Sequence, residues 1–422
     1  MEQLTAPAPA PATAPVVERR ARPWTVLASS SFRKLFVAST LSLFGDFFSY
    51  VAMAWLVLLL TGSSIALGTV LVVQALPRAI LMVVGGAISD RMSARLTMLG
   101  SMGLRAAFVA PLAVLVLTGH AQMWEVYGIA VVFGVVDAFF MPARSSILPQ
   151  VVADRELEPG NAVLNVVSMA AVIVGPVLGG LVVAALGIGW AFAADATCFA
   201  IGFVFILWLP ARSRPPQHAQ RDGGLAGQIT AGLRYAWNEM GLRIALIVIA
   251  VIDFAANGAI GVGLPTIAHS RYGAGAAGLG VLLGAWGVGA TVGALGAGFV
   301  PPPKRFGLLI MGLCLWLGIG LVVVGVVPSL ALGATTMAVT GIGTGVVNTY
   351  GVSWLQRRTV PEMQGRVMSL VMLASMGLTP IGFAVSGVIA QANVTLLFVI
   401  AGLMQVACAA GMAASRTART LT

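Results

Sequence analysis

The sequence predicts an all-helical membrane protein that crosses the bilayer twelve times, and two features of its composition point to this class. Apolar residues make up 59% of the 422 residues, whereas charged residues make up only 9%. A soluble domain of ordinary composition is about 25% charged. Twelve segments of about 20 residues, the length that crosses a bilayer as a helix, would use nearly all of the apolar residues. A membrane β-barrel is excluded because the apolar residues form continuous runs instead of alternating with polar ones.

Short polar breaks divide the apolar sequence into twelve runs. The first run turns at Thr61-Gly62-Ser63-Ser64, and the second ends in a polar turn that contains Asp90 and Arg91. To within a few residues, the expected helices are Leu35–Leu60, a second one ending at Ile88, Leu96–Leu117, Trp124–Met141, Ala162–Ala185, Ile188–Leu209, Ile244–Ala268, Ala274–Val300, Phe306–Val327, Leu330–Leu355, Val367–Ala390 and Val394–Ala414.

A long polar stretch, Pro210–Arg243, separates the first six expected helices from the last six. The Ala/Pro run near the N-terminus cannot bury enough apolar surface to fold, and no cleavable signal sequence precedes the first helix. The expected organisation is a disordered tail (1–34), a six-helix bundle (35–209), a linker (210–243), a second six-helix bundle (244–414) and a short tail (415–422).

The basic residues predict the orientation in the membrane. If the N-terminus is cytoplasmic, 21 of the 24 Lys and Arg residues lie in cytoplasmic segments, and only Arg271 lies in an outer loop. Cytoplasmic loops carry such an excess, so we expect both termini in the cytoplasm of a cell that holds the protein in its plasma or inner membrane. The net charge of +10 then indicates topology and contact with anionic lipid, not nucleic-acid binding.

Charged side chains inside the expected helices are the strongest pointer to function, because each is costly there unless it is paired or hydrated. At about 1.5 Å per residue, Asp46 and Arg78 both lie about 15–16 Å deep, close to the middle of the bilayer. Consecutive antiparallel helices could bring these two together. A buried carboxylate whose surroundings change can take up a proton on one side and release it on the other. The charged residues inside helices that we consider are Asp46, Arg78, Arg105, Asp137 and Asp253.

The turn after the second helix resembles the loop signature of the major facilitator superfamily. It places Gly86 four residues before Asp90-Arg91, with the basic Arg95 four residues further on, and it departs from the family pattern at Ser93 and Ala94. The resemblance implies two six-helix bundles and a cytoplasmic gate formed by this loop. The alternative is a turn that only stops translocation of the chain.

Further matches resemble the branch of this superfamily that contains siderophore and macrolide exporters. They include a Pro-Glu…Gly-Arg-Val element that ends in Gly365 and Arg366 before the eleventh helix, and a Pro-Ala-Arg segment after the fourth. We assign Gly365 and Arg366 to the cytoplasmic gate as well. The copy of the loop signature in the second half keeps Lys304 and Arg305 but has no acidic residue.

The fifth helix carries Gly175-Pro176-Val177-Leu178-Gly179-Gly180, which resembles the antiporter signature of the superfamily. Proline kinks a helix and glycine permits close packing, so this combination suits a helix that rocks between two states. The alternative is an ordinary packing face, since the chain has 51 glycines.

The family architecture implies that the first, fourth and seventh helices line the transport cavity. Asp46, Asp137 and Asp253 are then candidate proton sites, and the two arginines inside helices are counter-charges that compete with protons. Asp195 lies on a helix that the family places outside the cavity, and it is interpreted as a structural anchor. For all of them the alternative is a static ion pair.

Other function classes find little support in the sequence. Neither Lys34 nor Lys304 follows a glycine, so the phosphate-binding loop of an ATP-driven pump is absent. The three histidines show no catalytic or metal-binding spacing, so we expect no catalytic residues, no metal and no cofactor. The resemblance to the antiporter signature and to the exporter branch implies export of small, hydrophobic, drug-like molecules, driven by the proton gradient through antiport, and we expect the protein to be a monomer. Export of one siderophore or other natural product, or import of a metabolite, remains an alternative.

Overall fold

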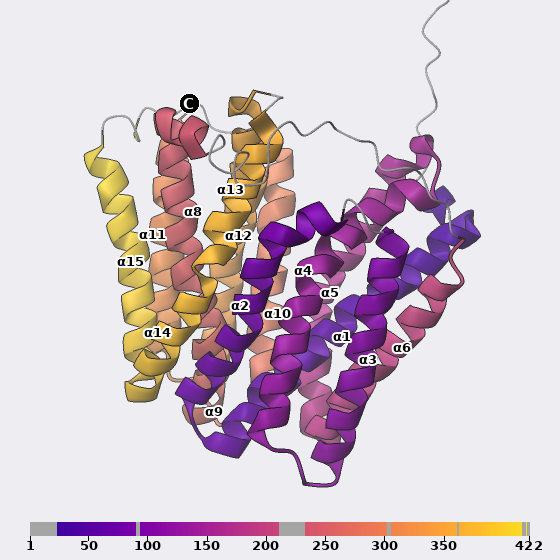
Figure 1. The fold of residues 1–422 in the computed structure, drawn as a ribbon. Coiled ribbons are helices and arrows are strands. Elements are labelled where there is room, and N and C mark those ends of the chain that lie inside the picture. The colour runs from indigo at the N-terminus through magenta and orange to yellow at the C-terminus, as the bar shows by residue number, and fades with distance from the viewer. Residues whose placement is uncertain are drawn as a thin grey trace, which may run out of the picture.

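The computed structural model describes residues 23–89, 93–210, 233–301, 305–360, 363–415 and 419. All regular elements in these ranges are helices. Twelve helical segments of the described residues are long and apolar enough to cross a membrane, as the sequence predicts. Figure 1 shows the helices packed side by side, most of them along a common direction.

The first half contains α1 (Ser30–Thr61), α2 (Ser64–Ser89), α3 (Ala94–Leu117), α4 (Met123–Val151), α5 (Leu157–Leu186) and α6 (Ile188–Leu207). In the second half, one span is built from α8 (Met240–Gly258), a π-helical segment (Ala259–Gly263) and α9 (Leu264–Ser270). It is followed by α10 (Gly275–Phe299), α11 (Phe306–Val326), α12 (Leu330–Arg358), α13 (Gln364–Gly377), α14 (Thr379–Ala392) and α15 (Val394–Ala414). The α13–α14 pair forms a single span, residues 364–392.

The chain becomes helical earlier than the sequence predicts. A 3-10 helix covers Pro23–Ala28, and α1 begins at Ser30 behind the Ser29 hydroxyl, which accepts a hydrogen bond from the Phe32 amide at 3.4 Å. Val26 and Phe32 are fully buried in one hydrophobic cluster. Residues 23–34 therefore depart from the expected disordered tail because their apolar side chains find a place in the core. Residues 1–22 and 211–232 lie outside the described ranges.

The fourth helix is also longer than expected, and it continues through Pro142 to Val151. Ile147 and Leu148 are almost fully buried in the same cluster as Phe32. Burial of this face against the first helix outweighs the tendency of proline to end a helix.

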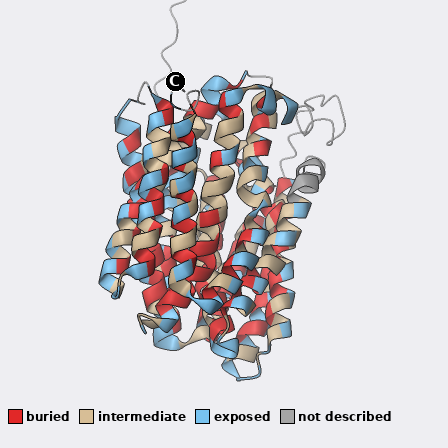
Figure 2. Ribbon diagram, turned by 90° about the vertical axis from the view of Figure 1, so that its left-hand side faces the viewer, coloured by how far each residue is buried: buried red, intermediate tan, exposed pale blue. Residues whose placement is uncertain are grey.

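Two halves meet at one side of the molecule and separate at the other. We call the side where α1 begins and α15 ends the terminal side, and the opposite one the far side. At the far side a single hydrophobic cluster takes in residues of both halves, among them Leu67 of α2, Leu264 of α9 and Leu279 of α10. At the terminal side the core splits into separate clusters, one in the first half and two in the second half, around Phe306 and Trp354 and around Cys314 and Met412. Figures 1 and 2 show the helices diverging toward the terminal side, with buried residues gathered where the halves meet.

Two pairs of helices, α2 with α14 and α5 with α10, make most of the contact between the halves. Glycines bring these helices together: a Cβ atom at Gly68 of α2 would lie 3.0 Å from the Gly387 Cα of α14. Such close approach is how helices associate in membranes, where apolar burial alone provides no driving force.

Close packing at glycines also joins α10 to α12 within the second half. A Cβ at Gly345 of α12 would overlap the Ala290 carbonyl oxygen of α10, whereas a Cβ at Gly351 of the same helix would meet no atom within 4 Å. Alanine substitutions at these two glycines, one in close contact with α10 and one without a contact, therefore form a matched pair that tests the packing of the two helices.

We expect Gly345→Ala to lower the thermal unfolding temperature of the purified protein, because overpacking costs about 1–3 kcal/mol. Gly351→Ala should leave this temperature unchanged or raise it, because alanine favours a helix over glycine by about 1 kcal/mol. Tryptophan fluorescence during heating measures both. Equal unfolding temperatures for the two variants would contradict the close contact of α10 and α12.

Candidate functional site

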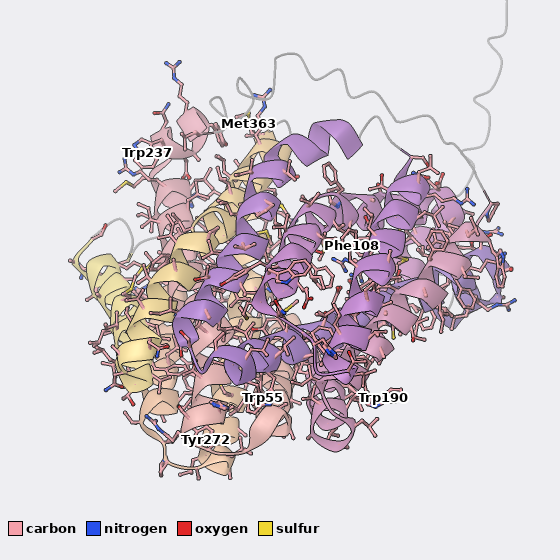
Figure 3. All side chains as sticks on the ribbon, turned by 60° about the horizontal axis from the view of Figure 1, so that its bottom comes forward. Trp55, Phe108, Trp190, Trp237, Tyr272 and Met363 are labelled. Atoms are coloured by element: carbon pink, nitrogen blue, oxygen red, sulfur yellow. The ribbon has the colours of Figure 1, made fainter. Side chains whose placement is uncertain are left out.

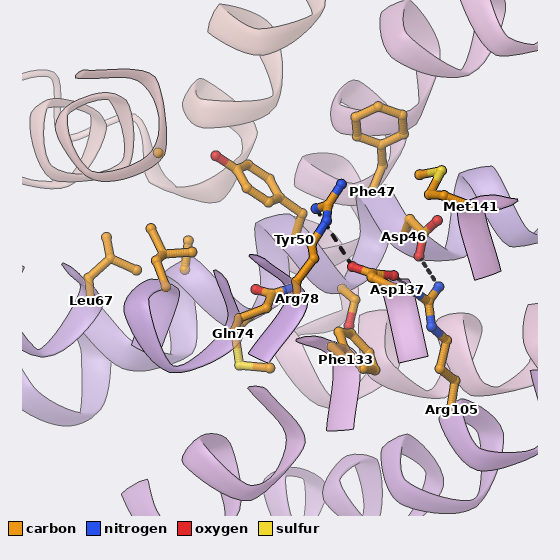
Figure 4. A pocket seen from close by; sticks show the side chains of 15 residues that line it. Asp46, Phe47, Tyr50, Leu67, Gln74, Arg78, Arg105, Phe133, Asp137 and Met141 are labelled. Carbon is orange, nitrogen blue, oxygen red and sulfur yellow. Dashed lines mark hydrogen bonds and ion pairs between the residues drawn. The ribbon is translucent and has the colours of Figure 1, made fainter. Parts of the chain in front are cut away.

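A buried arginine ties three helices of the first half together. Arg105 of α3 donates a hydrogen bond from Nη1 to Oδ1 of Asp46 on α1, at 2.5 Å, and another from Nη2 to Oδ1 of Asp137 on α4. Its side chain is only 2% exposed. Figure 4 shows the carboxylates of Asp46 and Asp137 side by side above the guanidinium.

Aromatic rings enclose the rest of the Arg105 guanidinium. Its Cζ atom lies 5.2 Å from the ring centre of Phe133, 5.4 Å from that of Phe140 and 4.9 Å from that of Phe199. Aromatic faces attract cations at these distances. The two carboxylates and the rings together compensate the loss of water around a buried charge.

Arg78 of α2 approaches the same cluster but is bound far more loosely. Its Nη1 atom lies 3.8 Å from Oδ2 of Asp137, and its side chain is 28% exposed. This distance is too long for a hydrogen bond, and the buried Nε atom has no hydrogen-bond partner. One more arginine, Arg144, lies seven residues after Asp137 on α4 and donates to the Ser168 hydroxyl at 3.1 Å.

A cavity of about 230 Å³ opens beside this cluster. Its lining comes from α1, α2, α3 and α4 together with Gly261 of the π-helical segment in the second half. Four of the five charged residues that the sequence singles out line it: Asp46, Arg78, Arg105 and Asp137. The fold thus brings these four side chains together at a single cavity. For Asp46 and Arg78, the similar depths estimated from the sequence already suggested that the two lie close together.

Asp253, the fifth of these residues, lies elsewhere. It is half-buried on α8, where its carboxylate interacts with the Ser375 hydroxyl of α13. Four residues later on the same helix, the Asn257 amide donates to the Thr379 hydroxyl at 3.4 Å. Asp253 therefore belongs to a polar contact between α8 and the α13–α14 span, and it does not line the cavity described above.

Asp195 of α6 is fully buried against the first helix, close to Gly45 and Ser49. A Cβ atom at position 45 would lie 2.6 Å from Oδ1 of Asp195. Only a glycine at position 45, directly before Asp46 in the sequence, leaves room for the Asp195 carboxyl group.

The residues assigned to the gate are only partly described. Asp90 and Arg91 lie outside the described residues, and Gly86 lies within α2. Arg95, at the start of α3, donates to the carbonyl oxygens of Ile206 and Leu207 at 3.2 and 2.6 Å. It thereby satisfies carbonyl groups at the C-terminal end of α6, where a cation is favoured.

The second pair of gate residues lies at the terminal side of the other half. Gly365 is exposed in the first turn of α13, and Arg366 contacts the Met363 sulfur at 3.4 Å.

The glycine-proline motif of α5 lies where three helices meet. A Cβ atom at Gly175 would lie 2.6 Å from the Phe47 ring of α1, and one at Gly179 would lie 3.3 Å from the Phe48 Cα. On the other side of α5, Gly180 and the Pro176 carbonyl contact the first turns of α10, in the second half. The motif therefore joins the cavity-lining helix α1 to the opposite half.

Contacts across the far side were not foreseen from the sequence. The Gln391 side chain of α14 accepts hydrogen bonds from the Ser64 amide at 2.7 Å and from the Ser63 hydroxyl at 3.1 Å. The Ser64 and Thr266 hydroxyls are hydrogen-bonded at 3.0 Å. Trp55 and His269 meet edge to face, with ring centres 5.2 Å apart, and Figure 3 shows Trp55 and Tyr272 at this side. Single polar residues at helix ends give no sequence signal for such pairing.

The described residues contain no group of three or more His, Cys, Asp or Glu side chains that could hold a metal ion. The cluster at the cavity instead combines two carboxylates, Asp46 and Asp137, with two arginines, Arg78 and Arg105, an arrangement suited to binding protons and polar groups of a ligand.

Comparison with known proteins places this site in a family context. Residues 21–420 match the family described as transmembrane secretion effector. The multidrug efflux pump Tap of Mycolicibacterium fortuitum is 29% identical over 372 residues, which cover 82% of this chain and 86% of the relative. The enterobactin exporter EntS of Escherichia coli O1:K1 / APEC is 24% identical over 344 residues, which cover 81% and 80%.

Solved structures share the fold. The nucleoside transporter NupG superposes with a TM-score of 0.72 at 13% identity, covering 91% of this chain and 98% of that one. A bacterial homolog of the human lysosomal transporter Spinster, in an inward-facing and unoccupied conformation, gives a TM-score of 0.64 at 12% identity and covers 90% and 96%. The protein is therefore a multi-pass membrane transporter, not an enzyme, and it belongs to the transmembrane secretion effector family of the major facilitator superfamily.

Proposed function

We propose that this transporter exports small, largely apolar molecules from the cytoplasm in exchange for protons. The observation that carries the proposal is the sharing of one buried arginine, Arg105, by two carboxylates at the wall of a cavity near the junction of the halves. The printed descriptions of two relatives, a multidrug efflux pump and an enterobactin exporter, support export as the direction.

The distribution of basic residues supports a cytoplasmic terminal side. The separation of the two halves at that side then corresponds to an inward-facing state, ready to receive a substrate from the cytoplasm. In the opposite state the halves would meet at the terminal side, where the gate residues Gly86, Asp90, Arg91, Arg95, Gly365 and Arg366 would close the path.

The two carboxylates have different parts in the proposal because they differ in exposure. The Asp46 side chain is 35% exposed and that of Asp137 only 12%. Asp46 is the group that exchanges protons with the cavity, and Asp137 stays charged as the counter-ion of Arg105 and Arg78. Protonation of Asp46 removes its charge and weakens its bond to Arg105, which loosens α1 from α3.

The glycine-proline motif transmits this change. Since Gly175 and Gly179 pack on α1 and Gly180 packs on α10, a shift of α1 alters the surface along which the halves rock. Pro176 has no amide hydrogen to hold the helix straight at this point.

Two alternatives to export of varied drug-like molecules are export of one natural product and import of a metabolite, and a different measurement identifies each. Resemblance to an enterobactin exporter favours a single natural product as substrate, in which case only one compound of a panel would be transported. An importer would show uptake into right-side-out cells without outward flux.

We expect everted membrane vesicles with the wild-type protein to accumulate a transported compound, and a protonophore to abolish this accumulation. Asp46→Asn should abolish proton-driven accumulation at unchanged abundance in the membrane, because an amide cannot exchange a proton with the cavity. Vesicle fluorescence with a panel of drug-like dyes measures the flux.

Asp253→Asn is the matched control for this experiment. Among the described residues Asp253 forms no ion pair, and its contact with a hydroxyl survives as an amide contact, so exchange should persist. Full activity of Asp46→Asn, or equal loss in both variants, would remove Asp46 from its proposed role.

Asp137→Asn should destabilise the protein more than Asp46→Asn. Removing one partner of a buried ion pair leaves an uncompensated charge and costs roughly 3–5 kcal/mol, whereas water can replace the more exposed Asp46 carboxylate. Thermal unfolding in detergent compares the two. The reverse order of unfolding temperatures would exchange the roles given to the two carboxylates.

Gln391→Ala should open the far side more often, because it removes two hydrogen bonds that cross between the halves. We expect faster labelling of Leu67→Cys by a membrane-impermeant maleimide added from outside, in a background whose three native cysteines are replaced by alanine. Leu67 is fully buried and lines the cavity.

The neighbouring Asn393→Ala is the control for Gln391→Ala, since the Asn393 side chain caps α15 within its own half. Faster labelling in both variants, or in neither, would argue against a latch at Gln391.

A further inference from the structure

We propose that Arg78, with Gln74 and Tyr50 beside it, forms a hydrogen-bond-donating subsite that recognises a neutral acceptor oxygen, such as a ketone, on an aromatic substrate. This inference deepens the proposed function, on which it rests for the assignment of the cavity to a substrate.

The two cavity carboxylates are already engaged. One oxygen of Asp46 and one of Asp137 accept hydrogen bonds from Arg105. A cationic substrate would have to displace this internal partner from among three aromatic rings. The carboxylates therefore serve the ion-pair cluster, and recognition falls to the other polar groups of the cavity.

Among those other groups, Arg78 has an ion pair but no hydrogen bond within the described residues. Arg78 carries five N–H groups, yet its closest carboxylate oxygen lies 3.8 Å away and its Nε atom is unpartnered. Gln74 lies one helical turn before Arg78, and both line the cavity with Tyr50 of α1. Unpaired buried donors are costly, so a ligand that supplies an acceptor gains what the protein alone lacks.

The remaining walls indicate the body of the ligand. Phe47, Met53, Leu71, Phe133 and Met141 line the cavity around these donors. Aromatic and thioether side chains adapt to flat apolar molecules. A cavity with apolar walls and a few converging polar groups is the usual design of a small-molecule site.

Antiport limits the charge of the acceptor. A negative charge at Arg78 would bind more tightly once Asp46 is protonated, so an anion and a proton would bind together instead of excluding each other. A neutral oxygen accepts the same hydrogen bonds without this electrostatic preference. The proton-exchange mechanism therefore selects a carbonyl or similar group over a carboxylate.

The test measures binding to purified protein in nanodiscs without a gradient. The probe is 6-propionyl-2-dimethylaminonaphthalene, a fluorescent ketone whose emission shifts to the red when its carbonyl accepts a hydrogen bond. The same naphthalene without the propionyl group is the matched compound. Tryptophan-sensitised emission reports the bound probe, and empty nanodiscs give the lipid background.

We expect wild-type protein to bind the ketone about tenfold or more tightly than the matched compound, as a hydrogen bond to a charged donor implies. Arg78→Met should abolish this difference and the red shift, while affinity for the matched compound stays the same. Tyr50→Phe, which removes a single hydroxyl, should reduce the difference in part. Arg357→Gln, which removes an exposed arginine outside the cavity, should bind like wild type.

Equal affinities for the two naphthalenes in wild-type protein, or no saturable binding of either, would overturn the subsite. So would a red shift that survives in Arg78→Met. Because binding is measured without a proton gradient, ketone recognition that depends on Arg78 would stand even if Asp46→Asn left transport unchanged. Loss of coupling in Asp46→Asn with no role of Arg78 in binding would leave only the proposed function standing.

Discussion

The bond of Arg105 to two carboxylates is the constraint on which the first half of the transporter depends. A guanidinium that is 2% exposed survives in a membrane only with its charge compensated, and here the compensation comes from α1, α4 and three aromatic rings. The same bonds place Asp46 at the cavity and hold α1 against α3 and α4. In the proposed mechanism, structure and coupling therefore share one set of contacts, because a proton on Asp46 would act on the interaction that positions a cavity-lining helix.

Proton exchange and ligand recognition are assigned to different parts of the cavity. In our proposals, Arg105 and the carboxylates form a charged end for proton exchange, whereas Arg78, Gln74 and Tyr50, which line the same cavity, form the end that donates hydrogen bonds to the ligand. Asp137 connects the two ends because its oxygens face different arginines, Arg105 and Arg78. A ligand bound at Arg78 would change the environment of Asp137 and, through Arg105, that of Asp46.

Much of the fold could be predicted because membrane helices are encoded by composition. All twelve spans follow from apolar runs, and residue depth alone indicates that Asp46 and Arg78 lie at similar levels. Depth gives no rotation about the helix axis, so the sequence could not tell that Arg105, and not Arg78, is the main partner of Asp46, or that Asp253 interacts with Ser375. The extension of α4 through Pro142 and the early start of α1 depend on burial between distant segments, which no local pattern reveals. The contacts of Gln391 depend on the meeting of the two halves.

The hydrophobic core at the far side has a consequence for the energetics of the cycle. Because Leu67, Leu264 and Leu279 belong to one continuous cluster, exposure of the cavity to the far side must divide it, just as the core is already divided between α1–α6 and the second half at the terminal side. The two states can be close in free energy only if a comparable area of apolar surface is covered where the halves now stand apart. An inert apolar wedge, even a lipid tail, lodged between α2 and α14 would unbalance this exchange and arrest the transporter without touching a charged residue.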